Sequence, residues 1–404
     1  MVEFSLLLAN SCLSHGDIPA DWREAVVYPI PKSHEFDAQL KNTRPITLLK
    51  TVRKCVVKVV TNHLSHLLAD NKILQGDNFA GLSGGSTDVP IKMLNAIIHQ
   101  HKYDSSDDQD LWIVSQDISK AFDSMDLNML KLTLERLHFP ALLVHFILNF
   151  FTRRNNKIIT CHGDTSRYRV CVGIDQGEII FPLLWVIYLD PLLTVLNQEA
   201  SDSFLLKFSA LLDYSPLEFE QHSLPVSHLT FMDNSTLIAS SKSGIKDRLF
   251  ITAEFYTLNN VQANSAKYVL LSSSNPSSFL GIWFSLSASS QFMLNQAHSM
   301  VKDMAALLAP KKLLAQHIAY LYNAVLLLSS TTPLALLYSK IPFSIQHAFC
   351  RFLSSHVASW QKIFTHPDFR DFADYAISYL QGFLGAESCP TTIDLTPWSQ
   401  IHSL

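Results

Sequence analysis

The sequence has little of what marks the simpler classes of protein. Its 404 residues include only 12 glycines and 17 prolines, which excludes collagen-like and low-complexity chains. Charged residues make up 16% and hydrophobic residues 48%, so the chain is not of the disordered class and can bury a large core. At roughly 100–200 residues per domain, the length predicts two to four lobes.

Patterned cysteines and long apolar runs are also missing. None of the six cysteines forms a Cys-x-x-Cys pair, which argues against a zinc knuckle and favours a reducing compartment. No apolar run reaches the ~18 residues of a membrane-spanning helix, and the first residues lack the basic leader of a signal peptide. We therefore expect an intracellular protein of the nucleus or cytoplasm that is neither secreted nor bound to a membrane.

The chain lacks the excess of positive charge that nucleic-acid-binding proteins usually have. Lys and Arg number 31 against 35 Asp and Glu, which gives a net charge of −4. The charge is uneven, however, because residues 31–60 hold seven basic and two acidic side chains. A basic segment can bind phosphate whatever the sum over the chain. The segment is either a nucleic-acid contact or an ordinary solvated helix face.

Hydrophobic periodicity predicts a mixture of helices and strands. Helices are expected at 51–68, 88–101, 127–137, from 182 onward and again from about 290, and the apolar segment 141–151 should be a deeply buried helix. Strands are expected at 22–30 and 111–118, as a pair within 229–240, and as a pair formed by 267–272 and 279–285. The pattern indicates an α+β core with a helical C-terminal lobe.

Two aspartates stand out because each lies at the end of an expected strand. Asp117 closes the strand at 111–118, and Asp233 lies near the tip of the pair within 229–240. If the strands are neighbours, the two carboxylates can share a pair of divalent ions, as in phosphoryl transfer. The alternative is that each Asp only caps or turns its own backbone.

An ordered series of segments surrounds these aspartates. The series consists of PIPK (29–32), NTRPITLL (42–49), NFAGLSGGST (78–87), QDISKAFDS (116–124), GIDQGEIIFPLLW (173–185), LTFMDNSTLIAS (229–240), ANSAKYVLL (263–271) and FLGIWFS (279–285). Over roughly residues 20–285 it resembles the palm and fingers of reverse transcriptases, and most of all those of the non-LTR (LINE-type) retrotransposon family. Each motif is weak alone, whereas the order and spacing of the whole series are specific.

The resemblance implies an α+β, right-hand polymerase architecture with fingers, an antiparallel palm sheet and a helical thumb. It places an N-terminal extension and fingers in 1–110, the palm in 111–285 with part of the fingers within 124–172, and a thumb-like or connection-like region in 286–404. The implied activity is RNA-directed DNA polymerisation by two Mg²⁺ or Mn²⁺ ions. The implied partners are an RNA template, a DNA primer and dNTP, with a flanking endonuclease or other element-encoded domains for which these 404 residues hold no motif.

The resemblance also implies roles for single residues. Asp117, Asp233 and the carbonyl of Ile118 would hold metal, and Lys267 would protonate the departing pyrophosphate. The ring of Phe122 would exclude a 2′-hydroxyl from the incoming nucleotide. The other implied contacts are Lys32, Arg44, Gln176 and Gly177 for the nucleotide, and Leu280, Gly281, Ile282 and Trp283 for a primer-holding hairpin. The alternative for Phe122 is a core aromatic, and the alternative for Lys267 is a surface lysine. Gln176-Gly177 and the 280–283 segment could each be a plain turn.

Two positions depart from the family pattern. The family's Tyr-x-Asp-Asp hairpin reads Phe231-Met232-Asp233-Asn234, so a neutral amide replaces one of three carboxylates. The family's Ser before Pro182 reads Phe181, which cannot cap a helix and whose ring is expected close to the template. Both departures predict weakened catalysis, so the alternative function is a catalytically inactive retroelement relic that only binds nucleic acid.

Overall fold

The computed structural model describes residues 2–32, 39, 42–103, 110–119, 121–160, 162–198, 202–211, 219–264, 268–271, 277–279 and 282–284, with isolated residues between 286 and 311. The helices are α1 (Val2–His15), a 3-10 turn (Ala20–Arg23), α2 (Thr51–Asp70), α3 (Asp88–Tyr103), α4 (Ala121–Ser124), α5 (Leu127–Arg136), α6 (Ala141–Asn149), α7 (Phe181–Gln198) and α8 (Lys242–Leu258). The predicted helical thumb lies almost wholly outside the described residues.

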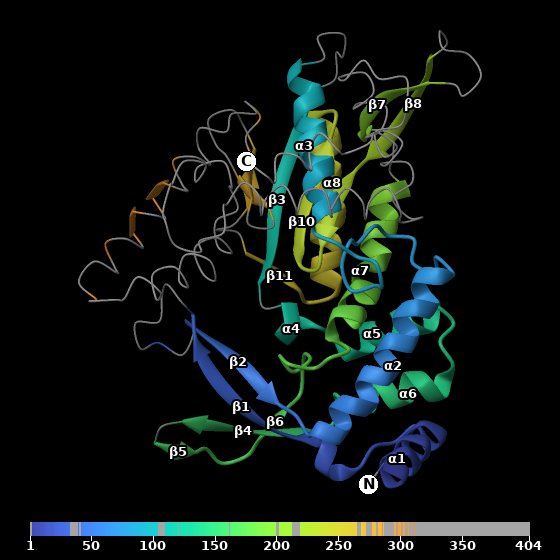
Figure 1. Ribbon diagram of the computed structural model, residues 1–404, viewed down its shortest axis with the longest axis vertical. Coiled ribbons are helices and arrows are strands. Elements are labelled where there is room, and N and C mark those ends of the chain that lie inside the picture. The colour runs from blue at the N-terminus through green and yellow to red at the C-terminus, as the bar shows by residue number, and fades with distance from the viewer. Residues whose placement is uncertain are drawn as a thin grey trace, which may run out of the picture.

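A first sheet occupies one end of the molecule (Figure 1). Its strands are β1 (Glu24–Pro31), β2 (Thr43–Leu48), β4 (Arg154–Thr160), β5 (Gly163–Asp164) and β6 (Tyr168–Val170), in the order β2-β1-β4-β5 with β6 also on β4. Strand β1 runs antiparallel to β2 and parallel to β4. Because side chains alternate along a strand, Val27 and Thr47 are buried on one face while Tyr28 and Leu48 are exposed on the other.

A second sheet carries the two aspartates. Its strands are β3 (Trp112–Ser119), β9 (His228–Phe231), β10 (Asn234–Ala239), β11 (Gln262–Ala263) and β12 (Val269–Leu270), in the order β11-β3-β10-β9 with β12 also on β3. All of these pairs are antiparallel. Two hairpins complete the strands: β7 (Phe204–Leu211) with β8 (Phe219–Val226), and β13 (Ser277–Phe279) with β14 (Ile282–Phe284).

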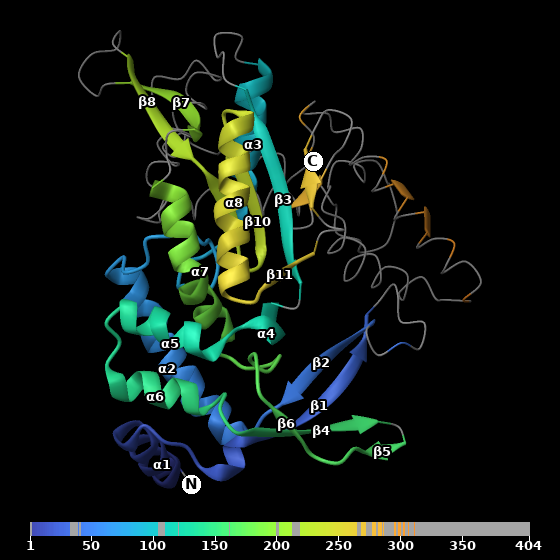
Figure 2. The ribbon, with the colours of Figure 1, turned by 180° about the vertical axis from the view of Figure 1, so that it is seen from behind.

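Helices cover both faces of the second sheet, as the two opposite views show (Figures 1 and 2). Val114 belongs to the core cluster that includes α7 and α8, whereas its neighbour Ile113 belongs to the cluster that includes α3. Helix α7 is the most deeply buried helix of the described chain, and its rings Phe181, Trp185 and Tyr188 stack in series. It is also the one described helix long and apolar enough to span a membrane, but 67% of it is buried, as in a core helix.

The structure confirms the predicted α+β class and corrects some of its elements. Helix α6 is buried only on one side, where Val144, Phe146 and Ile147 pack into the core, and Leu142 is exposed because this helix lies at the edge of the molecule. The expected pairing of 267–272 with 279–285 is wrong: β12 pairs with β3, and residues 277–284 form their own hairpin. The pairing of β13 with β14 is favoured over a pairing with the more distant β12 because only two residues separate β13 from β14.

Candidate active site

The register of the second sheet brings the predicted acidic residues together. Asp117 lies directly opposite Asn234 in the β3–β10 pair, and Asn234 lies opposite Phe231 in the β9–β10 pair. Only Met232 and Asp233 separate the paired residues, so Asp233 occupies a two-residue turn beside the end of β3. Residues 116 positions apart in the sequence thus meet at one sheet end.

The backbone directions at this sheet end can be worked out from one hydrogen bond. The Asn264 N–H donates to the carbonyl of Asp117 at 2.9 Å, so residue 117 directs its backbone groups toward β11. Asp117 and Asn234 therefore form the non-hydrogen-bonded type of pair, with Cα atoms about 4.5 Å apart. One further residue adds about 3.8 Å, which puts the Cα atoms of Asp117 and Asp233 within about 8 Å. The Ile118 carbonyl, one residue on, points the other way, to the side of the turn.

The oxygen atoms gathered here suit a hard divalent cation. Two carboxylates, one amide oxygen and one carbonyl are oxygen ligands of the kind that Mg²⁺ binds, and Mg²⁺ needs few protein carboxylates when substrate phosphates complete its shell. Within the described residues no group of three or more His, Cys, Asp or Glu side chains could hold a metal. The residues present fit a sparse metal site that is completed by substrate.

Several predicted site residues fall where the structure describes little or nothing. Phe122 lies in α4, directly after β3, but its side chain is outside the described set. Lys267, Leu280 and Gly281 are outside the described residues. Ile282 and Trp283 form part of β14, and their side chains are outside the described set. Their proposed roles stay predictions.

Gln176 and Gly177 lie against the edge of the first sheet. The Thr47 N–H of β2 donates to the carbonyl of Gln176 at 2.6 Å. Gly177 has a φ of +116°, and a Cβ there would lie 2.7 Å from the Thr47 carbonyl oxygen. Both observations require glycine. The 172–178 loop therefore packs closely against β2 at the edge of the first sheet.

Two buried arginines hold this loop, and sequence reasoning missed both. Arg154 pairs with Asp175 at 2.9 Å and donates to the carbonyls of Val172 (3.1 Å) and Gly173 (2.6 Å). Arg53 pairs with Glu178, and both side chains are at most 1% exposed. Burial raises the pKa of the Glu178 carboxyl, and the Arg53 guanidinium opposes that rise. No short motif marks these pairs, since Arg53 and Glu178 lie 125 residues apart.

Comparison with known proteins identifies the family. The sequence model described as "Reverse transcriptase (RNA-dependent DNA polymerase)" matches residues 30–284, which is more than half of the chain and includes every strand of both sheets except most of β1. The chain belongs to the reverse transcriptase family. The fold is accordingly a right-hand polymerase fold, and the expected division into fingers and palm stays a prediction.

The curated relatives are RNA-directed DNA polymerases of non-LTR retrotransposons. The chain is 25% identical over 189 residues to a probable RNA-directed DNA polymerase from transposon BS of Drosophila melanogaster, covering 46% of this chain and 20% of that protein. It is 22% identical over 262 residues to the Pol polyprotein of retrotransposable element R2 of Popillia japonica, covering 64% of this chain and 34% of that protein. The chain thus spans about a fifth of the first relative and about a third of the second.

A solved structure of telomerase from Candida tropicalis, in complex with a fragment of telomeric RNA, is also similar. It has a TM-score of 0.47 and 10% identity, and the match covers 93% of this chain and 61% of that chain. A similarity of this size adds nothing to the family assignment, which rests on the match of the sequence model.

The expected position of Phe181 is wrong. Its ring is 1% exposed and stacks on Trp185 with ring centroids 5.9 Å apart, inside the main core cluster. Phe181 is the first residue of α7, and the Ile180 carbonyl before it accepts the hydrogen bond of Leu184. The side chain therefore fills the core of the protein and does not occupy template space.

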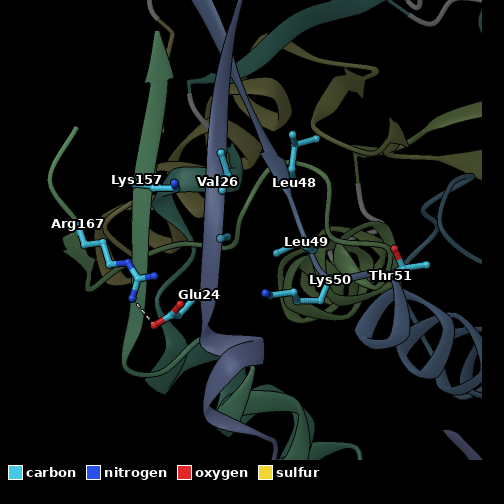
Figure 3. Close-up of a pocket in the computed structure, with 9 residues that line it drawn as sticks. Glu24, Val26, Leu48, Leu49, Lys50, Thr51, Lys157 and Arg167 are labelled. Atoms are coloured by element: carbon cyan, nitrogen blue, oxygen red, sulfur yellow. Dashed lines mark hydrogen bonds and ion pairs between the residues drawn. The ribbon is translucent and has the colours of Figure 1, made fainter. Parts of the chain in front are cut away.

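The basic residues predicted to contact the nucleotide lie on the first sheet. Arg44 is exposed on β2, opposite Ile30 of β1, and Lys32 follows β1 at the same end of the pair. A groove of about 510 Å³ on the sheet is lined by Lys50, Lys157, Arg167 and Glu24 among others (Figure 3). Arg167 pairs with Glu24, and Lys157 pairs with Asp164. This groove is therefore less basic than its lysine and arginine content indicates, and the predicted basic cleft stays a prediction.

Proposed function

We propose that the chain is the polymerase domain of a non-LTR retroelement protein, which extends a DNA primer with dNTP on an RNA template inside the cell. The observation that carries the proposal is the register that sets Asp117 beside Asp233 at one end of the palm sheet. Two divalent ions, Mg²⁺ or Mn²⁺, bound there would stabilise the entering and leaving oxygens of nucleotidyl transfer. Asp117, Asp233 and the carbonyl of Ile118 are the residues that would hold them.

The other residues serve the substrates in this proposal. Gln176 and Gly177 contact the nucleotide or template, as the resemblance to the family implies, and the close packing of Gly177 on the Thr47 carbonyl fixes this segment of backbone. Lys32 and Arg44 contact the triphosphate, because a guanidinium and an ammonium both match phosphate oxygens. Phe122 excludes a 2′-hydroxyl, and Lys267 donates a proton to the departing pyrophosphate. Residues 280–283 hold the primer.

Asn234 weakens the reaction in this proposal. It faces Asp117 directly across the β3–β10 pair, so its amide stands where a third carboxylate would attract cations. An amide oxygen still binds a hard cation but brings no negative charge. Mn²⁺ binds such ligands somewhat more tightly in general, so it restores part of the cation occupancy.

Primer extension on poly-rA with an oligo-dT primer tests the proposal. We expect little extension with Mg²⁺, a trace with Mn²⁺, and a gain of about tenfold or more, or about 1.4 kcal/mol in the barrier, for Asn234→Asp. Asp117→Asn should abolish all extension. Asp17→Asn, which removes a surface carboxylate paired with Arg23, is the matched control and should change nothing.

Two results would change the assignment. Retained binding of the primer–template without extension in Asn234→Asp would favour the inactive relic that only binds nucleic acid. Full Mg²⁺ activity of the unmodified chain would show that Asn234 is no defect.

A further inference from the structure

The turn that carries Asp233 has a backbone conformation that needs outside support. Met232 has a φ of +56°, in the left-handed region that side chains other than glycine rarely adopt. Such conformations persist when the surrounding structure fixes them. The contacts of Met232 therefore show what holds the turn.

A side chain from a distant loop grips the backbone of Met232. The Oδ1 atom of Asn78 accepts a hydrogen bond from the Met232 N–H at 3.2 Å, and its Nδ2 atom donates to the Met232 carbonyl at 3.5 Å. The neighbouring Phe79 N–H donates to the carbonyl of Thr230 at 3.0 Å. One amide thus contacts both backbone groups of the strained residue, and the adjoining peptide adds a bridge to β9.

The loop that presents Asn78 is itself fixed to the core helix α7. The Asp190 carboxylate, 1% exposed, accepts from the N–H groups of Gln75 (2.9 Å) and Gly76 (2.8 Å) and pairs with Arg136. A Cβ on Gly76 would lie 2.5 Å from the Cβ of Leu193, so the loop lies tightly on the helix. The support therefore runs from α7 through this loop to the turn.

We infer that Asn78 is a positioning residue, which fixes the Met232–Asp233 turn and thereby places the Asp233 carboxylate beside Asp117. The inference rests on the proposed function, because it assigns a purpose to the position of Asp233. A purely local role is the alternative, since the same Oδ1 atom also accepts from the Ala80 N–H at 3.1 Å. The two roles predict different hydrogen-exchange rates for the Met232 N–H when the side-chain amide of Asn78 is removed.

Hydrogen exchange of single amides in the metal-free protein tests the contact itself. In Asn78→Ala the Met232 N–H should exchange about three- to tenfold faster, as expected for one lost hydrogen bond, while the amide of Leu237 in β10 stays unchanged. Asn197→Ala is the matched control. Asn197 also binds this loop, through Asp77 at 3.1 Å, and its other hydrogen bonds go to the Gln75 carbonyl and to Ser227, so the Met232 amide should not respond.

Binding of Mn²⁺, measured from the free-ion signal in electron paramagnetic resonance, tests the positioning. In an Asn234→Asp background, Asn78→Ala should weaken Mn²⁺ binding about tenfold, the low end for residues that orient metal ligands. Adding Met232→Gly should restore most of that affinity, because glycine adopts positive φ without support. A defect in the packing of the 75–80 loop would not be restored in this way.

The outcomes are distinguishable. Unchanged exchange of the Met232 amide in Asn78→Ala would overturn the inference, as would faster exchange with unchanged Mn²⁺ affinity. Equal effects of Asn78→Ala and Asn197→Ala on the turn would also overturn it, since they would mean general loosening of the loop. Absence of Mn²⁺ binding in the Asn234→Asp parent would contradict the proposed function and the purpose inferred for Asn78, while the exchange result would still report on the contact.

Discussion

The two segments that frame the candidate active site are held by opposite kinds of interaction. The 172–178 loop, which carries Gln176 and Gly177, is fixed by two buried guanidiniums that pair with Asp175 and Glu178. The Met232–Asp233 turn is held by one neutral side chain, the amide of Asn78. The support of the loop is charged and deeply buried, whereas the turn lies half-exposed at the end of a sheet.

This difference follows from what each segment presents. The predicted site groups of the loop are backbone and the neutral side chain of Gln176, so the charges of the two ion pairs that hold the loop do not disturb them. The turn carries a carboxylate that is proposed to bind cations, and a guanidinium beside it would compete with those cations. A carboxylate in place of the amide would instead repel Asp233. An amide fixes the backbone of the turn and adds no net charge near the metal ligands.

The largest expected effect comes from breaking the ionic support. Arg53→Met leaves the Glu178 charge buried without a partner, so the free energy of unfolding should fall by about 3–5 kcal/mol in urea denaturation. Because the guanidinium that opposes the effect of burial is then lost, the pKa of Glu178 rises further, and a raised carboxyl pKa makes the folded state lose stability as the pH increases. The loss should therefore be larger at pH 8 than at pH 5.

Two controls separate the ion pair from general damage. Arg23→Met removes a cation whose partner Asp17 is 63% exposed, and it should cost no more than about 1 kcal/mol. Arg53→Met combined with Glu178→Met should recover much of the stability, because paired apolar side chains replace buried ions well. An Arg53→Met variant as stable as Arg23→Met would refute the contrast between loop and turn.

A smaller loss of stability is expected at Phe181, the position where the family pattern predicted weakened catalysis. Phe181→Ser would restore the family residue, but the ring is buried in the core against Trp185. Removing it leaves a cavity, so we expect about 3 kcal/mol of destabilisation, the low end of the range for Phe to Ala, because a serine at a helix start can bond the backbone. Thermal unfolding measures it, with Phe250→Ser, whose side chain is 62% exposed, as the control. Equal stability of the two variants would contradict the core assignment.

The comparison of loop and turn also shows what the sequence could predict. The motifs located β3, β9, β10 and α7, because runs of apolar residues and turn residues are local signals, and Asp117 and Asp233 were placed at neighbouring strand ends from the family series alone. The supports were not predictable. Arg53 looked like one more cation of a basic segment, and Asn78 looked like part of a Gly/Ser turn, because their partners are 125 and 154 residues away. Phe181 was misplaced since a motif position does not show which way a ring points.

The smallest expected effect sharpens the comparison at the turn. Asn234→Asp adds a carboxylate opposite Asp117, so without metal the like charges should lower stability by about 0.5 kcal/mol, or roughly 1–2 °C in melting temperature. With Mn²⁺ the order should reverse, because an ion that binds only the folded state stabilises it by mass action. Asn197→Asp adds a carboxylate beside Asp77, away from the turn, and should be destabilised equally in chelator and in Mn²⁺. The decisive measurement is the difference between the two variants on adding Mn²⁺: if both shift by the same amount, the carboxylate at position 234 does not face a metal site, and the neutral support of the turn by Asn78 loses its electrostatic explanation.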